Sequence, residues 1–431
     1  MLKRKVTAQL QEWSDRQDKK PLVVDGARQV GKTFSIESFI KQRYEQVISL
    51  NFIETPKYRE IFSSDLSIEG ITRQLSMLFP TTKMEPGKTV LFLDEIQACP
   101  NAITALKFLA ASPVFDTIAT GSLLGMSYKD VASFPVGYTQ RLQMNGLDFE
   151  EFLWARALSP EQIDDLRECF DRNSPVPAAV HTRMLELFRE HIVVGGMPEV
   201  VFAFAKNQDF GEVLGLQRQI VHDYADDIIK YAEGAEKTKA RACFLSVPRQ
   251  LSKSYKKFSY SLVDKNGSSR KYGGSLMWLD DAGITSFCNK LNRIELPLEG
   301  NASPDVFKVY LRDTGLLVSM LEDGSQADII QGNLGIYKGA IYENIIADTL
   351  IKLGRKLYYF EYRSQIEVDF ILRREGATCA VEVKSADNKK SKSLQAAIKN
   401  YGASQGIRLS TKNLGTPGAV TSIPLYMAMF L

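Results

Sequence analysis

The sequence has few of the residues from which metal clusters and disulfide frameworks are built. It contains only three histidines, too few for a histidine-rich metal site. Its five cysteines are widely spaced and include no C-x-x-C pair: Cys99, Cys169, Cys243, Cys288 and Cys379. This pattern argues against a zinc site or a disulfide framework, and it favours a reducing compartment.

Long hydrophobic runs are also missing. No stretch approaches the roughly 20 apolar residues of a membrane-spanning helix, and no apolar signal segment follows the charges of Met1–Val6. We therefore expect a cytoplasmic protein with no membrane partner. Apolar residues make up 44% and charged residues 24% of the 431 positions, which is ordinary for a globular protein. This length is sufficient for two or three domains.

The net charge of +3 is small but unevenly distributed. Residues 335–431 hold 14 Lys and Arg against 8 Asp and Glu, so the rest of the chain is net negative. A basic C-terminal third is a weak indication of nucleic-acid binding, because phosphate binding requires clustered charge. A solvated lysine-rich surface would explain it equally well.

A complete phosphate-binding loop follows an apolar run near the N-terminus. The pattern G-x-x-x-x-G-K-[ST] is met by Gly26, Gly31, Lys32 and Thr33. We expect Lys32 to reach the β- and γ-phosphates and the Thr33 hydroxyl to be a Mg²⁺ ligand. The expected nucleotide contacts extend over the whole loop: Gly26, Ala27, Arg28, Gln29, Val30, Gly31, Lys32, Thr33 and Phe34. A glycine-rich turn without a ligand is the alternative.

Hydrolysis requires a carboxylate that holds the metal and a group that activates water. Asp94 and Glu95 follow four apolar residues about 60 positions after the loop, at the end of an expected buried strand. Asp94 would hold Mg²⁺, and Glu95 would polarise the attacking water. A helix-capping acidic turn is the alternative.

Four further polar residues are candidates for the same site. Thr120 and Ser122 follow the next apolar strand and could contact the γ-phosphate or the water, unless one merely caps a helix. Arg28 and Arg141 could neutralise charge in the transition state, although Arg28 could equally pair with an acidic neighbour.

Strands and helices alternate over the first ~150 residues, which predicts an α/β domain with a parallel sheet. The expected strands are Leu22–Asp25, Gln46–Phe52, Thr89–Asp94, Thr117–Thr120 and Gln140–Asn145. Residues 151–240 are predicted to be helical. Residues 241–334 are predicted to form a winged-helix-like module and connector, with a helix over Lys271–Ala282 that Gly283 ends. Such a module binds DNA in some proteins and only connects domains in others.

The motifs of the chain resemble prokaryotic AAA-type ATPases that carry a C-terminal domain of unknown function. The resemblance is carried by Gly26–Thr33, Leu93–Gln97, Thr120–Ser122, Leu147–Leu153, Gly195–Glu199, Asn289–Leu291 and Asp313–Leu317. It covers nearly the whole chain. It implies an ATP-binding core, a helical and winged-helix middle region, and a nuclease-like C-terminal domain.

A second carboxylate cluster lies in residues 335–431, which return to mixed α/β structure. Asp369, followed by Glu382 and Lys384 on the next expected strand, resembles the core of PD-(D/E)xK nucleases of the restriction-endonuclease type. Glu382 and Lys384 face the same side of their strand because side chains alternate. Asp369 and Glu382 would share Mg²⁺, and Lys384 would orient the attacking water.

The same resemblance implies that Glu343, on the preceding helix, adds a carboxylate to the metal site. Charged residues on a solvated strand face are the alternative explanation for this cluster.

Together these features predict an ATP-binding, Mg²⁺-dependent ATPase that processes nucleic acid, DNA rather than RNA, and that could form homo-oligomers. The alternative is a regulatory or signalling ATPase whose C-terminal domain only binds DNA or a protein partner. A nucleotide-gated scaffold with negligible turnover is a third interpretation.

Overall fold

The computed structural model describes residues 2–122, 135–231, 236–253, 256–333, 338–363, 365–384, 391–415 and 418–431. The chain divides into two compact units. The N-terminal unit comprises Arg4–Gly146, and the C-terminal unit comprises Leu147–Leu431 together with Met1–Lys3. The expected division into four domains stays a prediction.

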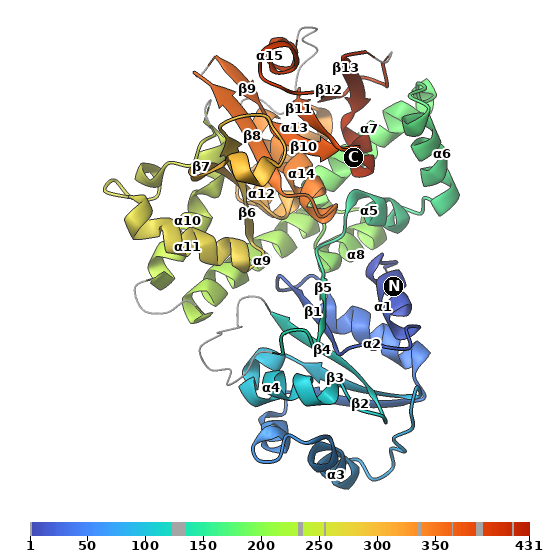
Figure 1. Cartoon of the computed structure of the whole chain (residues 1–431). Coiled ribbons are helices and arrows are strands. Elements are labelled where there is room, and N and C mark those ends of the chain that lie inside the picture. The colour runs from blue at the N-terminus through green and yellow to red at the C-terminus, as the bar shows by residue number, and fades with distance from the viewer. Residues whose placement is uncertain are drawn as a thin grey trace. The chain divides into compact units, whose positions relative to one another are not determined.

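A five-stranded parallel sheet forms the centre of the N-terminal unit (Figure 1). Its strand order is β2-β3-β4-β1-β5. The strands are β1 (Leu22–Gly26), β2 (Gln46–Asn51), β3 (Thr89–Asp94), β4 (Asp116–Ser122) and β5 (Gln140–Gln143). All five strands expected from the sequence are confirmed, as is the parallel sheet.

Helices cover both faces of this sheet. They are α1 (Val6–Ser14), α2 (Lys32–Arg43), α3 (Ile68–Leu78) and α4 (Pro100–Leu109), with 3₁₀ turns η1 (Pro56–Phe62) and η2 (Ile96–Ala98). Side chains of β1 alternate between two apolar clusters: Val24 packs with α1 and α2, and Val23 packs with α3 and α4. Because all five strands are parallel, their carboxyl ends meet at one edge of the sheet, and Asp94 lies there.

The C-terminal unit contains eleven α-helices within the described residues. They are α5 (Phe149–Ala155), α6 (Pro160–Asp171), α7 (Ala178–Val194), α8 (Pro198–Asn207), α9 (Phe210–Tyr231), α10 (Glu236–Leu251), α11 (Ser269–Asp281), α12 (Thr314–Ser319), α13 (Ser325–Gln331), α14 (Lys338–Lys352) and α15 (Lys392–Asn400). The 3₁₀ turns are η5 (Tyr260–Leu262), η6 (Leu298–Asn301) and η8 (Leu425–Phe430).

Two of these helices test how well their ends could be predicted. Gly283 has a φ of 72° and follows the last residues of α11, so it ends that helix as predicted. The sequence also predicts a helix that ends near Ser254; in the structure α10 ends at Leu251, and Ser254 itself lies outside the described residues.

Two four-stranded sheets complete the C-terminal unit. The first has the order β7-β6-β8-β9, with β6 (Thr285–Leu291), β7 (Ala302–Leu311), β8 (Leu357–Tyr362) and β9 (Ile366–Val368). The second has the order β10-β11-β12-β13, with β10 (Phe370–Arg374), β11 (Ala377–Val383), β12 (Gln405–Ser410) and β13 (Val420–Pro424). β11 is antiparallel to β10 but parallel to β12, so the second sheet is mixed.

The first sheet joins segments on both sides of residue 334. β6 pairs with β7 in antiparallel orientation and with β8 in parallel orientation. β6 belongs to the expected winged-helix-like module, and β8 belongs to the expected nuclease-like domain. Both of those fold assignments stay predictions, and this sheet places strands of the two regions side by side.

The sequence predicts one strand over Glu367–Arg373, but in the structure it is interrupted at Asp369. β9 pairs with β8, whereas β10 pairs with β11 in the other sheet. The Asp369 carboxylate accepts a hydrogen bond from the backbone N–H of Val383 at 2.7 Å, so its side chain bonds the end of β11 at this crossing. Asp369 therefore sits where the chain passes from one sheet to the other.

A search of the described residues found no helix that combines the length and the apolar character needed to span a membrane.

Candidate functional site

The phosphate-binding loop connects β1 to α2. Gly31 has a φ of 85°, a left-handed conformation that favours glycine, and it directly precedes α2. Gly26 is required for a different reason, because a Cβ atom there would lie 2.2 Å from the carbonyl oxygen of Met144. Lys32 donates hydrogen bonds to the carbonyl oxygens of Gly26 at 3.1 Å and Ala27 at 2.7 Å, so its ammonium lies inside the loop.

Asp94 is the centre of this site. Its carboxylate, 3% exposed, accepts hydrogen bonds from the Thr33 hydroxyl at 3.1 and 3.2 Å and from the Asn51 amide at 3.0 Å. The Thr120 hydroxyl and the backbone N–H of Glu95 also donate to it. The four side chains come from α2, β2, β3 and β4, so the sheet and the loop together assemble the site. The sequence-predicted residues Thr33, Asp94 and Thr120 are thus brought into direct contact.

Glu95 occupies an unusual backbone position beside Asp94. Its φ of 55° is rare for a residue with a side chain and costs free energy. The side-chain amide of Gln97 donates a hydrogen bond to the Glu95 carboxylate. The predicted catalytic carboxylate is therefore oriented by a fixed turn and by a neighbouring amide.

The electrostatics of Lys32 reflect the same burial. Burial lowers the pKa of Lys32 to about 8, although Glu95 and Asp94 act in the opposite direction. Both carboxylates thus lie within electrostatic reach of the lysine that the motif assigns to the phosphates.

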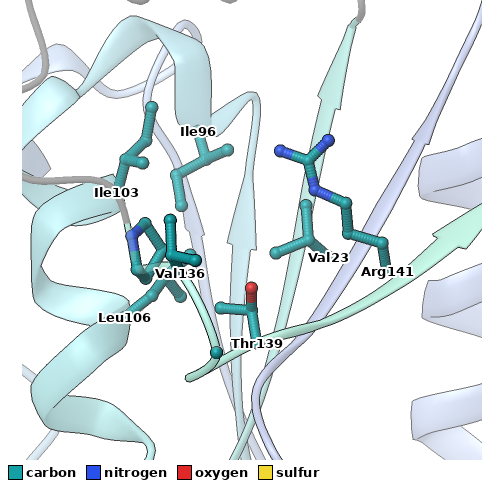
Figure 2. A pocket seen from close by; sticks show the side chains of 9 residues that line it. Val23, Ile96, Ile103, Leu106, Val136, Thr139 and Arg141 are labelled. Atoms are coloured by element: carbon teal, nitrogen blue, oxygen red, sulfur yellow. The ribbon is translucent and has the colours of Figure 1, made fainter.

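For the other predicted residues of this site, Arg28, Arg141 and Ser122, the structure gives less direct information. Arg141 lies 3.8 Å from the Asp25 carboxylate, which is nearly buried, and burial raises the pKa of Asp25 above its ordinary value. Arg141 also lines a cavity of about 290 Å³ with the apolar residues Val23, Ile96 and Val136 (Figure 2). The side chain of Ser122 lies outside the described part of the structure. The roles predicted for Arg28 and Arg141 stay predictions.

The sequence did not single out Asn51 or Gln97. Asn51 could have been found from its position, because it ends the strand beside β3, and polar residues at the carboxyl ends of parallel strands meet at one edge. Gln97 had no such signal, since its contact with Glu95 depends on the turn between them.

The second cluster begins at the end of β11. Glu382 and Lys384 form an ion pair at 2.6 Å, and the Glu382 side chain is 5% exposed. Asp369 reaches the same strand end through its hydrogen bond to Val383. The residues of β11 are buried except at its first position, so the Glu382 carboxylate does not lie on a solvated strand face, whereas Lys384, which follows β11, is 31% exposed. The oxygen Glu382 Oε2 is buried and has no hydrogen-bond partner within the part of the chain that the structure describes.

Glu343 on α14 has cationic partners that the sequence did not predict. Lys256 forms an ion pair with Glu343 Oε1. The Tyr310 hydroxyl donates to Glu343 Oε2 at 3.2 Å, and the Lys308 ammonium lies 3.7 Å from the same oxygen. Lys308 also forms an ion pair with Glu367 at 2.6 Å, and its side chain is 1% exposed.

The pKa values of this cluster follow from burial and from the lysines. Burial, reinforced by the neighbouring Glu343, raises the pKa of Asp369 to about 8. Burial also opposes the charge on Glu343, but Lys308 and Lys256 outweigh it and hold the pKa of Glu343 below its usual range. Burial disfavours the charge on Lys308 as well, yet Glu343, Glu367 and Asp369 together raise its pKa above the ordinary value. Glu343 and Lys308 are therefore an ionised pair in the interior.

A search for groups of three or more His, Cys, Asp and Glu side chains that could hold a metal ion found none within the described ranges. Each of the two clusters therefore offers, among these residues, fewer than three such side chains in a metal-binding arrangement. A cation bound at either cluster would need further oxygen ligands.

Other motifs of the chain have structural contacts. Asp313 accepts a hydrogen bond from the backbone N–H of Gly196 at 2.7 Å and caps α12 through Leu316. A Cβ atom on Gly315 would lie 2.7 Å from the Cα atom of Gly195, so the two glycine motifs pack backbone to backbone. Asp148 and Glu151 form a reciprocal cap at the start of α5.

Three family models match the chain. One, described as an AAA domain, matches residues 18–153. Two others, each described as a domain of unknown function, match residues 185–327 and 338–426. No curated protein matches the chain.

The chain is also similar to solved structures at low identity. The Walker-type ATPase PABY2304 of Pyrococcus abyssi is 15% identical, with 74% of this chain and 96% of that chain covered and a TM-score of 0.45. The Aeropyrum pernix ORC1 protein, solved in complex with DNA, is 13% identical over 77% of this chain and 92% of that chain, with a TM-score of 0.29.

The family match and the geometry around Asp94 both point to a nucleotide-binding domain in the N-terminal unit. The matched residues 18–153 contain the loop, Asp94 and Thr120. The first third of the chain therefore contains a P-loop domain that matches the model of an AAA domain.

Proposed function

We propose that the protein hydrolyses ATP with Mg²⁺ at the carboxyl edge of the β2-β3-β4-β1-β5 sheet. The observation that carries this proposal is the convergence of Thr33, Asn51 and Thr120 on the single buried carboxylate of Asp94. Within the described residues, the side chains that donate hydrogen bonds to this carboxylate are neutral hydroxyls and an amide, and the Lys32 ammonium lies within electrostatic reach of it. Hydroxyl and carboxylate oxygens are the ligands that Mg²⁺ prefers, so the residues present fit this ion.

Each residue of the site has a defined task in this proposal. Thr33 and Asp94 would hold Mg²⁺, which when bound neutralises charge on the β- and γ-phosphates. Lys32 would exchange the carbonyl oxygens of Gly26 and Ala27 for phosphate oxygens of ATP. Glu95, fixed by its turn and by Gln97, would accept a proton from the attacking water or polarise it.

The test is Glu95→Gln, which keeps the size of the side chain and removes the base. We expect release of inorganic phosphate from ATP to fall by about 10²- to 10⁴-fold, while binding of Mg·ATP is retained. Glu37→Gln, on the exposed surface of α2, is the matched control and should leave turnover unchanged. Wild-type turnover in Glu95→Gln would show that this assignment is wrong.

A second candidate function is divalent-cation-dependent cleavage of nucleic acid by the C-terminal unit. The buried oxygen Glu382 Oε2, which has no partner among the residues that the structure describes, favours it, because a buried oxygen without a partner is costly unless a ligand satisfies it. Asp369 and Glu382 would hold the cation, which when bound polarises a phosphodiester, and Lys384 would orient water. Their oxygen donors fit Mg²⁺ or Mn²⁺.

This second candidate is tested with a panel of DNA and RNA substrates and either cation. Cleavage that disappears in Asp369→Ala and in Glu382→Ala supports it. Cleavage that persists in both variants contradicts it, and absence of cleavage by the wild type favours the regulatory alternative, in which the C-terminal unit only binds DNA or a protein. A DNA partner and homo-oligomeric assembly stay predictions.

A further inference from the structure

Lys308 stands out among the charged residues of the C-terminal unit. It lies on β7, in the apolar run Phe307–Leu311, and its side chain is 1% exposed. Lysine is almost never fully buried unless its charge is paired. The ammonium also lies 4.8 Å from the centre of the Tyr359 ring, so an aromatic face covers it in addition to the carboxylates.

The carboxylates around Lys308 are already occupied. Its Nζ atom is 2.6 Å from Glu367 Oε1 and 3.7 Å from Glu343 Oε2. The remaining oxygen of Glu343 pairs with Lys256, and the Tyr310 hydroxyl donates to Glu343 Oε2. Each oxygen of the Glu343 carboxylate therefore has a lysine ammonium nearby: Lys256 at Oε1 and Lys308 at Oε2.

A divalent cation at Glu343 would have to share this space with two ammonium groups. Like charges a few ångströms apart in a buried environment repel strongly, because little solvent screens them. Mg²⁺ also requires near-octahedral oxygen coordination, which an oxygen held by an ammonium cannot readily supply. By contrast, Glu382 Oε2 has no hydrogen-bond partner among the described residues, although Glu382 Oε1 pairs with Lys384 at 2.6 Å.

We propose that Lys308 is the resident cation of the C-terminal carboxylate cluster, so that Glu343 binds lysines and does not ligate a metal. The carboxylates that hold any divalent cation in this cluster are then those of Asp369 and Glu382, without that of Glu343. This last point rests on the second candidate function, whereas the role of Lys308 does not.

The experiment uses the full chain carrying Asp94→Asn, so that the N-terminal site does not contribute, and measures Mn²⁺ binding without nucleotide by calorimetry. We expect Glu343→Gln to leave the Mn²⁺ dissociation constant within about twofold, and Glu382→Gln to weaken binding by about tenfold or more. A tenfold loss in Glu343→Gln would overturn the assignment of Lys308. An unchanged affinity in Glu382→Gln would overturn the metal site at Asp369 and Glu382 instead.

Thermal melting of the same chain tests Lys308 even if no Mn²⁺ binds. Lys308→Met leaves Glu343 and Glu367 short of one positive charge, so its melting temperature should fall. Adding Glu343→Gln removes one of the two negative charges that Lys308→Met leaves without this ammonium. The double variant should therefore melt at or above the melting temperature of Lys308→Met alone. Simple addition of the two losses would contradict the proposal.

Discussion

Two buried carboxylates, Asp94 and Glu343, lie in the two units of this protein and have opposite surroundings. Asp94 accepts hydrogen bonds from the hydroxyls of Thr33 and Thr120 and from the amide of Asn51. Glu343 is bound by the ammonium of Lys256, lies 3.7 Å from that of Lys308, and accepts from a tyrosine. The side chains that donate hydrogen bonds to the first carboxylate are neutral in the described part of the chain, whereas the second carboxylate is paired with lysine ammonium groups. The hydrogen-bond donors therefore distinguish the two sites: neutral donors leave Asp94 able to bind a metal ion, whereas lysine ammonium groups already pair with Glu343.

The largest difference between the two units should appear when each loses its lysine. Lys32→Ala removes the ammonium that would bind the phosphates, and we expect ATP turnover to fall by about 10²-fold or more. The reason is that developing charge on the phosphoryl group loses its fixed positive partner. Lys41→Ala, at an exposed position of the same helix, is the control for a phosphate-release assay. Equal ATP turnover in Lys32→Ala and Lys41→Ala would contradict the role assigned to Lys32 at the phosphates.

The corresponding change in the C-terminal unit should affect stability. Lys308→Met leaves the buried Glu343 carboxylate and the partly exposed Glu367 carboxylate without their shared ammonium, and we expect a loss of about 3–5 kcal/mol in the free energy of unfolding. Lys290→Met is the matched control, because Lys290 is 27% exposed and 3.9 Å from Glu361. It should cost about 1 kcal/mol or less. Denaturant unfolding of both variants checks the difference, and similar costs would show that burial of the pair has no effect.

A smaller effect is expected from the neutral partner of Asp94. Asn51→Ala removes one hydrogen bond that orients the carboxylate, and we expect the Mg²⁺ concentration for half-maximal ATP turnover to rise by about tenfold. Asn51 also accepts hydrogen bonds from the backbone of Ile53 and Glu54, so melting curves must accompany the assay. A large drop in melting temperature with an unchanged Mg²⁺ requirement would assign Asn51 to the turn alone.

The smallest expected effect is a pH dependence in the C-terminal cluster. The pKa of Asp369 is raised to about 8 by burial and by Glu343, so the folded protein holds a proton there that the unfolded chain releases near pH 4. The stabilisation from this proton is complete below the unfolded pKa and is lost as pH rises toward 8. Without metal, wild type should therefore lose a few degrees of melting temperature relative to Asp369→Asn between pH 5 and pH 8. A constant difference across this range would contradict the environment assigned to Asp369.

The fold and site of the N-terminal unit could be predicted closely because short, contiguous sequence segments specify them. The loop from Gly26 to Thr33 is contiguous, and Asp94 ends a continuous apolar run that can only be a buried strand. Parallel strands then bring Thr120 to the same edge without further information. Asn51 was accessible by the same logic.

The C-terminal cluster could be predicted only in part, because it depends on pairing between distant strands. The alternation of Glu382 and Lys384 was visible in the sequence, but the partners of Glu343 were not. Lys308 reaches Glu343 because α14 packs against β7, and no local pattern gives that arrangement. A lysine within the apolar run Phe307–Leu311 is a signal of a buried charge, although the sequence does not say which carboxylate it meets.

The most direct test of the central claim compares Asp94→Asn with Glu343→Gln in Mg²⁺-dependent ATP turnover of the full chain. The carboxylate with neutral partners should be essential, so Asp94→Asn should lose about 10²-fold or more in turnover at saturating Mg²⁺. Glu343→Gln, which changes the carboxylate already paired with lysines, should turn over ATP at the wild-type rate. Wild-type turnover in Asp94→Asn, or an equal loss in both variants, would contradict the account.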